Sequence, residues 1–377
     1  MDDLIDSTLH QEHPLHPHPE GNDHLAEISK KGYNYLKEGV LEEAEKAFKQ
    51  ILEIDATNSY ALVGLGDVAR KRGEKKKAME YYQKCLAEFP GNGHALFGLA
   101  DCYKATNQFT KALEIWEEYL LVHDKNIAVL TRVADTYRKL RNFGKSKETF
   151  LKVLAVHDDN AYALIGLGYL HYDFKDYREA LLYWEKVYTA DTAHADVRVL
   201  TSLGNCHRKL KTYREGLPYY QRVLEEESDN FYALFGIADC YRGMNQMDKS
   251  LEYWNRILER DPDNKVILAR AGDTLRQLGR LDEAEKSYYK ALDIEFDTYA
   301  ALGLAMIHKE QGRYQEAVTS LSGIMDKDPN NARIYIEIAE CQQKMGQRNE
   351  ALNTLGLLQR RGLKNHQFNG MMNRRRY

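Results

Sequence analysis

The sequence predicts an all-α protein built from about ten repeated pairs of helices, and three observations predict this fold class. The 377-residue chain contains only seven prolines, a low content that favours helices. Small residues recur about every 34 residues, and a second small residue follows each of them twelve positions later. A large residue, usually aromatic, follows four positions after that. Self-similarity at such a period indicates a repeat architecture rather than several compact domains.

The recurring residues form three series in one register. The first series consists of Gly32, Gly66, Ala100, Ala134, Gly168, Gly204, Ala238, Gly272, Ala305 and Ala339. The second consists of Ala44, Ala78, Ala112, Ser146, Ala180, Gly216, Ser250, Ala284, Ala317 and Ala351. The third consists of Phe48, Tyr82, Trp116, Phe150, Trp184, Tyr220, Trp254, Tyr288, Leu321 and Leu355. Small residues let two antiparallel helices approach closely, and a bulky residue one turn later fills the space beside them. Each repeat is therefore predicted to be a helical hairpin.

Turn residues mark where each helix of a hairpin ends. The turns inside repeats carry Gly or Asn, which accept the left-handed conformation that ends a helix. They are Gly39, Gly73, Gly279, Gly312, Gly346, Asn107 and Asn245. The second helices end at polar turns such as residues 261–264, Asp-Pro-Asp-Asn, where Asp or Asn can also cap the next helix.

These features together resemble the tetratricopeptide repeat: the 34-residue period, the small residues at positions 8 and 20, the aromatic at position 24 and the Asp-Pro-x-Asn turn. The resemblance implies a right-handed superhelical α–α solenoid whose first helices line a concave groove, and a role in protein interaction. We expect the solenoid at residues 25–365, between a disordered His/Pro-rich segment at 1–24 and a basic tail at 366–377. The ten repeats are predicted at 25–58, 59–92, 93–126, 127–160, 161–196, 197–230, 231–264, 265–297, 298–331 and 332–365.

Positions 2, 5, 9 and 12 of each first helix trace one stripe, which by the resemblance faces the groove. In six of repeats two to eight, an acid or amide at position 9 is followed one turn later by a base. Two interpretations remain open: a ladder that solvates the helices and joins neighbouring repeats, or a striped groove that clamps an extended peptide or partner helix. The pairs are Asp67 and Arg70, Asp101 and Lys104, Asp135 and Arg138, Asn205 and Arg208, Asp239 and Arg242, and Asp273 and Arg276.

Tyrosines on the same stripe are the second group of candidates. Repeat five replaces the charged pair by tyrosines, next to a two-residue insertion at residues 190–196. A tyrosine cluster flanked by charge is typical of a binding hot spot, while packing against the neighbouring first helix is the alternative. The candidate rings are Tyr60, Tyr162, Tyr169, Tyr172 and Tyr232.

A longer repeat is superimposed on the first. Residues Ala95–Tyr103 are nearly repeated at Ala233–Tyr241, an offset of 138 residues, which indicates that a block of four repeats was duplicated. We therefore expect similar surfaces on the two halves. Glycines at position 6, such as Gly64, Gly98 and Gly236, permit close approach either of a ligand backbone or of another helix.

Composition and motifs argue against several function classes. The net charge of −4 gives no basic footprint for nucleic acid. No run of 18 apolar residues exists, so we expect no membrane insertion. The sequence holds no constellation of catalytic residues and no cofactor or metal motif, so we expect no enzyme, no cofactor and no metal. The clamp that holds acidic chaperone tails is not expected either, because Ala128 and Val266 occupy its lysine position.

The resulting functional hypothesis is a non-catalytic scaffold that binds a peptide or partner protein in the groove near repeats four to six. The alternatives are a structural subunit that uses its ends or outer wall, and an accessory subunit that recruits an enzyme. Exposed terminal faces leave end-to-end self-association open. The N-terminus lacks an apolar signal core, which predicts a cytoplasmic protein, or an exported one after signal removal. His-rich tracts bind metals in some proteins, but a flexible linker is the favoured interpretation of residues 1–24.

Overall fold

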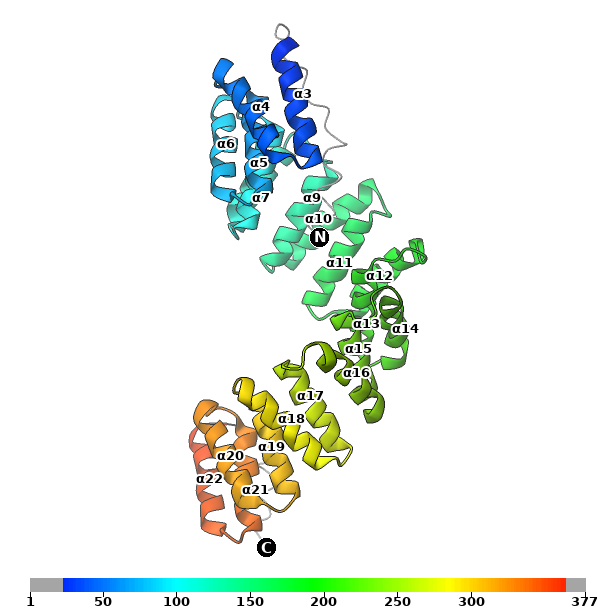
Figure 1. Ribbon diagram of the computed structural model, residues 1–377, viewed down its shortest axis with the longest axis vertical. Coiled ribbons are helices and arrows are strands. Elements are labelled where there is room, and N and C mark those ends of the chain that lie inside the picture. The colour runs from blue at the N-terminus through cyan, green and yellow to red at the C-terminus, as the bar shows by residue number, and fades with distance from the viewer. Residues whose placement is uncertain (1–22, 364–377) are drawn as a thin grey trace. The chain divides into compact units, whose positions relative to one another are not determined.

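The computed structural model describes residues 23–363, which form twenty α-helices and no strand (Figure 1). The chain divides into two compact units, Met1–Asp191 and Thr192–Tyr377. Within each unit every helix packs against the next one along the chain. The predicted all-α repeat fold, with two helices in each of about ten repeats, is confirmed. The predicted His/Pro-rich segment up to residue 22 and the basic tail lie outside the described residues.

Odd-numbered helices are the first helices of repeats, and even-numbered helices are the second. The helices of unit 1 are α3 (Asp23–Glu38), α4 (Leu41–Ile54), α5 (Ser59–Lys71), α6 (Lys75–Glu88), α7 (Gly93–Ala105), α8 (Phe109–Leu120), α9 (Ile127–Lys139), α10 (Phe143–Val156), α11 (Ala161–Asp173) and α12 (Tyr177–Ala190). Helix α3 begins at Asp23, two residues before the predicted start of the first repeat.

Unit 2 continues the same alternation. Its helices are α13 (Val197–Leu210), α14 (Tyr213–Glu226), α15 (Phe231–Gly243), α16 (Met247–Arg260), α17 (Lys265–Gln277), α18 (Leu281–Ile294), α19 (Thr298–Glu310), α20 (Tyr314–Lys327), α21 (Ala332–Lys344) and α22 (Arg348–Arg360). The two-residue insertion predicted between repeats five and six falls between α12 and α13.

Asparagine side chains start most first helices. The side chain of each accepts the backbone N–H three residues on, which satisfies one of the free donors at the helix start. The N···O distances are 3.0–3.2 Å, and the capping residues are Asn58, Asn92, Asn126, Asn160, Asn230 and Asn264.

The turns inside repeats have positive φ, as predicted. All five predicted glycines and both predicted asparagines adopt it, with φ between 60° and 80°. Arg141, Lys175 and Lys211 adopt the same conformation with φ of 61–65°, although their side chains disfavour it.

Aromatic rings from the second helices join neighbouring repeats. The ring of Tyr82 is fully buried, and it lies against glycines of two successive first helices. A Cβ on Gly66 would lie 2.5 Å from this ring, and one on Gly98 would lie 2.4 Å from it. Phe48, Tyr220 and Tyr288 occupy the same place between their own pairs of glycines. The glycines at position 6 therefore accommodate a ring of the preceding repeat, and the packing interpretation is confirmed.

Candidate functional site

The acid–base pairs of unit 1 connect successive first helices. Lys104 on α7 lies 3.2 Å from Asp135 on α9, and Arg132 on α9 donates to Asp101 on α7 at 2.9 Å. Arg138 on α9 bonds Asp135 at 2.9 Å and also pairs with Asp173 on α11. Asp67 and Arg70, the first predicted pair, lie 3.6 Å apart on the same helix.

The same kind of ladder runs through unit 2. Arg208 on α13 bonds Asp239 on α15 at 2.8 Å, and it also bonds Asn205 at 3.1 Å. Arg242 bonds Asp239 at 2.7 Å. Arg276 on α17 lies 3.2 Å from Asp273 and 2.6 Å from Glu310 on α19. The bridges between repeats show that the ladder has a structural role, and its role in binding stays a prediction.

Tyrosines of the second helices donate hydrogen bonds to position 9 of the ladder. Tyr82 Oη donates to Asp67 at 2.7 Å, and Tyr220 Oη donates to Asn205 at 3.0 Å. The ring that joins two repeats thus also holds the acid or amide at position 9 of its own repeat. A buried hydroxyl that finds such a partner avoids the cost of an unsatisfied polar group.

The tyrosines of repeat five are half-buried on α11. The Tyr169 ring meets the edge of Trp184 on α12 at a centroid distance of 5.3 Å, and the Arg138 guanidinium lies 5.8 Å above it. Tyr172 contacts Tyr177 at 5.2 Å and Trp184 at 5.8 Å. Tyr169 and Tyr172 therefore pack on the second helix of their own repeat, and Tyr169 also contacts Arg138 of the neighbouring first helix α9.

Tyr60 and Tyr232, two of the tyrosines at position 2, differ in exposure. Tyr60 is half-buried, and its carbonyl accepts a hydrogen bond from Tyr33 Oη at 3.1 Å. Tyr232 is 70% exposed. It lines an open hollow of about 720 Å³ together with Thr201, Arg198 and residues 193–196 of the inserted turn. The insertion thus contributes to a surface depression of unit 2.

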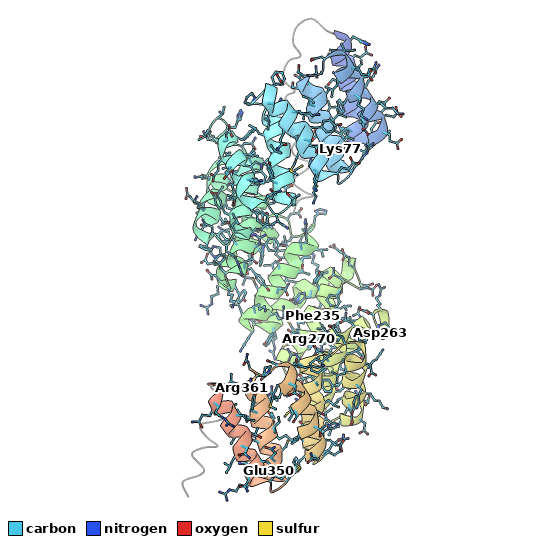
Figure 2. The ribbon with its side chains drawn as sticks, turned by 90° about the vertical axis from the view of Figure 1, so that its left-hand side faces the viewer. Lys77, Phe235, Asp263, Arg270, Glu350 and Arg361 are labelled. Atoms are coloured by element: carbon cyan, nitrogen blue, oxygen red, sulfur yellow. The ribbon has the colours of Figure 1, made fainter. Side chains whose placement is uncertain are left out.

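The 138-residue duplication places an arginine over a phenylalanine in each unit. In unit 1, Arg132 lies 4.5 Å above the Phe97 ring. In unit 2, Arg270 lies 4.9 Å above the Phe235 ring and 3.5 Å from Asp239; Figure 2 shows Phe235 and Arg270 together. Stacking on the ring holds the planar guanidinium in place. These arginines stand at position 6, where most other repeats carry glycine, and they are not among the site residues that the sequence predicts.

The two clusters differ in accessibility. Arg132 and Lys104 are 5% and 9% exposed in unit 1. Their counterparts in unit 2, Arg270 and Arg242, are 31% and 32% exposed. The prediction that the two halves offer similar surfaces is therefore wrong for accessibility, although the residue types recur.

The carboxyl pKa values also diverge between the units. Burial raises the pKa of Asp101 above its usual value, and the nearby Arg132 charge offsets only part of this shift. Burial acts in the same direction on Asp239, but its hydrogen bond and charge contact with Arg242, and those with Arg208, outweigh burial and lower its pKa. Asp239 is thus held as a carboxylate by several cations.

Other chemistry is sparse among residues 23–363. No group of three or more His, Cys, Asp or Glu side chains in this range is arranged to hold a metal ion. All five cysteines are buried free thiols, and burial raises the pKa of Cys85 and Cys102 to about 11. None of the helices in the described range is long and apolar enough to cross a bilayer.

Comparison with known families gives matches along most of the chain. Two family models, both described as tetratricopeptide repeat, match it three times each. One matches residues 69–134, 207–264 and 308–374, and the other matches 29–93, 132–195 and 241–301.

Curated relatives match only in part. Cellulose synthase 1 operon protein C of Komagataeibacter xylinus is 34% identical over 86 residues, which is 22% of this chain and 6% of that protein. Cellulose synthase operon protein C of Komagataeibacter sucrofermentans is 33% identical over 81 residues, 21% of this chain and 6% of that protein. The matched stretch is thus a small fraction of these relatives' length.

Solved structures match this chain at low identity, and the first of the two below shares its fold. A tetratricopeptide repeat protein of Parabacteroides merdae is 17% identical, with a TM-score of 0.52 over 67% of this chain and 98% of that chain. Yeast Tom70 is 14% identical, with a TM-score of 0.46 over 93% of this chain and 94% of that chain.

Proposed function

Because this chain belongs to the tetratricopeptide repeat family, whose repeats indicate a protein-interaction scaffold, we propose that it is a non-catalytic adaptor that binds a peptide or partner protein along its first helices. The first helices of repeats two to four and of repeats six to eight carry position 2 and the acid–base pair on one stripe, so a bound chain that runs across neighbouring repeats would meet the same kinds of side chain at these steps.

A row of exposed apolar side chains in unit 2 supports the proposal most directly. Tyr232, Val266 and Tyr299 occupy the same position of α15, α17 and α19. They are 70%, 51% and 48% exposed. Leaving three large side chains in water on successive helices forgoes the free energy that burial would provide, so a partner that covers them gains it. Tyrosine also adds contact area at a small cost in side-chain entropy.

In unit 1, the tyrosines of repeat five form a separate candidate surface. Tyr162, Tyr169 and Tyr172 keep part of their area exposed, although Trp184 covers much of two of the rings. We expect the double variant Tyr169→Ala/Tyr172→Ala to lose a partner that the wild type retains, once circular dichroism shows unchanged helicity. Equal retention by both proteins would remove repeat five from the surface.

Site-specific photocrosslinking tests the proposal with a matched pair of tyrosines. Tyr299 on the first helix α19 and Tyr289 on the second helix α18 are 48% and 46% exposed. A photoreactive phenylalanine analogue replaces each in turn, and crosslinked partners are identified by mass spectrometry. We expect adducts from position 299 and few from position 289.

The reverse pattern would contradict the proposal. Adducts confined to position 289 would place the interaction on the second helices, as expected for the alternative of a structural subunit. The alternative of an accessory subunit for an enzyme rests on the match to cellulose synthase operon protein C, which covers 22% of this chain. It predicts that the adduct at position 299 is an enzyme subunit.

A further inference from the structure

Three arginines from consecutive first helices converge on one carboxylate in unit 2. Arg208 on α13 and Arg242 on α15 bond Asp239 at 2.8 and 2.7 Å. Arg270 on α17 lies 3.5 Å from the same carboxylate, and stacks on the Phe235 ring (Figure 2). Three positive charges therefore share one negative charge at the centre of this cluster.

The neighbouring acids do not remove the excess. Asp273 lies 3.2 Å from Arg276, and Glu310 pairs with the same arginine at 2.6 Å. Within the part of the chain that the structure describes, the Nε–H groups of Arg270 and Arg276 are buried and have no hydrogen-bond acceptor. Because these two buried atoms cannot be reached from solvent, it is the excess positive charge of the cluster that favours an added carboxylate.

The excess charge can be reached from solvent. About a third of the side chain of Arg242 and of Arg270 is exposed. Tyr299 is close enough to this cluster that Asp273, Arg242 and Arg270 influence its hydroxyl. Tyr299 of the apolar row therefore lies beside the arginines, and Val266 stands one helical turn before Arg270 on α17.

From this charge complementarity we propose that α13, α15, α17 and α19 bind an acidic peptide segment in which a Glu or Asp stands beside a large apolar residue. The peptide carboxylate binds Arg242 and Arg270, and its apolar side chain packs on the row of Tyr232, Val266 and Tyr299. This inference rests on the proposed function and adds the chemistry of the partner. A nucleic acid fits less well, because Asp239 and Asp273 within the cluster repel a continuous line of phosphates.

Fluorescence anisotropy with defined peptides tests the inference on the full chain. The probe is a fluorescein-labelled nonapeptide of alternating Glu and Leu, and its control carries Gln at every Glu position. We expect the Glu peptide to bind at least about tenfold more tightly than the Gln peptide, with an affinity that falls as salt rises. Equal affinity of the two peptides would overturn the inference.

Two variants of equal charge change locate the binding. We expect Arg242→Gln/Arg270→Gln to weaken the Glu peptide at least about tenfold, which removes most of its advantage over the Gln peptide. Arg214→Gln/Arg260→Gln removes two positive charges from the second helices α14 and α16 and should leave its affinity unchanged. Equal loss in both variants would show a general charge effect and would overturn the assignment.

A substitution at Asp239 gives a result of opposite sign. Asp239→Asn removes the carboxylate that competes with the peptide for the arginines, so we expect the Glu peptide to bind several-fold more tightly while the fold loses stability. A cluster that is only structural would lose stability without any gain in affinity, which would count against the inference.

Two further outcomes separate the inference from the proposed function. If an oligouridylate of nine nucleotides bound more tightly than the Glu peptide, the cluster would be a nucleic-acid surface. Suppose that the Gln peptide bound as tightly as the Glu peptide, and that Tyr232→Ala/Tyr299→Ala abolished the binding of both. Peptide binding by this surface would then be supported, and its preference for acidic peptides would be contradicted. An absence of adducts at position 299 contradicts the proposed function itself, whichever peptide binds.

Discussion

Repeats three and four of unit 1 and repeats seven and eight of unit 2 carry the same charged and aromatic residue types 138 residues apart, but they use them differently. In unit 1, Arg132 and Lys104 are buried against Asp101 and Asp135. In unit 2, the equivalent arginines share Asp239 and keep part of their surface in water. The duplicated motif therefore retains the contact of Arg132 with Asp101 as that of Arg270 with Asp239, but the cation at position 12 changes partner and both cations of unit 2 become more exposed.

Breaking one arginine contact in each unit should give the largest difference. Arg132→Ala leaves Asp101 as a buried charge without its closest cation, and we expect a loss of about 3–5 kcal/mol of stability. Arg270→Ala leaves Asp239 with Arg208 and Arg242, so we expect a loss of no more than about 1 kcal/mol. Urea denaturation measures both, and hydrogen exchange shows which unit opens. Equal losses would mean that the two clusters have the same energetics.

Glycine substitutions should show that the ring packing is the same in both units. A Cβ at Gly98 would lie 2.4 Å from the Tyr82 ring, and one at Gly236 would lie 2.3 Å from the Tyr220 ring. We expect Gly98→Ala and Gly236→Ala to destabilise the chain by similar amounts, about 1–3 kcal/mol each, as measured by thermal and urea denaturation. If one substitution cost much more stability than the other, the two units would differ in the packing of their cores and not only in their charged clusters.

Acid titration should separate the two equivalent aspartates. The lowered pKa of Asp239 means that its contribution to stability is present above pH 3.8 and is lost as the pH falls through its folded value. The raised pKa of Asp101 means that its contribution is present below pH 3.8 and is lost as the pH rises through its folded value. We therefore expect Asp239→Asn to flatten the acid loss of stability and Asp101→Asn to steepen it, in urea titrations from pH 3 to 7. Changes of the same sign would contradict the assignment.

The smallest effect on stability is expected at Tyr232. Because its side chain is 70% exposed, Tyr232→Ala should change the free energy of unfolding by less than about 0.5 kcal/mol. The same variant should reduce partner capture, as a residue of a binding surface would. A loss of more than about 1 kcal/mol in denaturant titrations would instead assign the ring a structural role.

The repeat fold could be predicted from the sequence because the residues that indicate turns and helix contacts do so within a single repeat. Gly39 and Asn107 mark turns by themselves, and the small residues such as Gly66 mark helix contacts by their period. Arg141, Lys175 and Lys211 escaped prediction because tertiary packing, not side-chain preference, sets their positive φ.

The candidate site was only partly predictable. The period places Asp239 and Arg242 on one helix face, but the contacts of Arg208 and Arg270 with Asp239 depend on how three helices stack. Arg270 is absent from the residues predicted for the site, because it lies outside the stripe of positions 2, 5, 9 and 12. Arg270 follows Arg132 by 138 residues, the offset of the duplicated block, and this repetition is the signal in the sequence that could have identified it.

The rings that join the repeats also restrict which repeat can follow which. Where the large residue of a second helix is Phe or Tyr, the first helix of the next repeat has glycine at position 6. Phe48 lies against Gly64 in this way, and Tyr288 lies against Gly303. Where the large residue is Trp116 or Trp254, Arg132 or Arg270 follows instead. A repeat with arginine at position 6 would clash if it were placed after a repeat whose large residue is Phe or Tyr. A repeat with glycine at position 6 would leave a void if it were placed after one whose large residue is Trp. An array that is shortened or extended should therefore keep each ring together with the position-6 residue of the repeat that follows it.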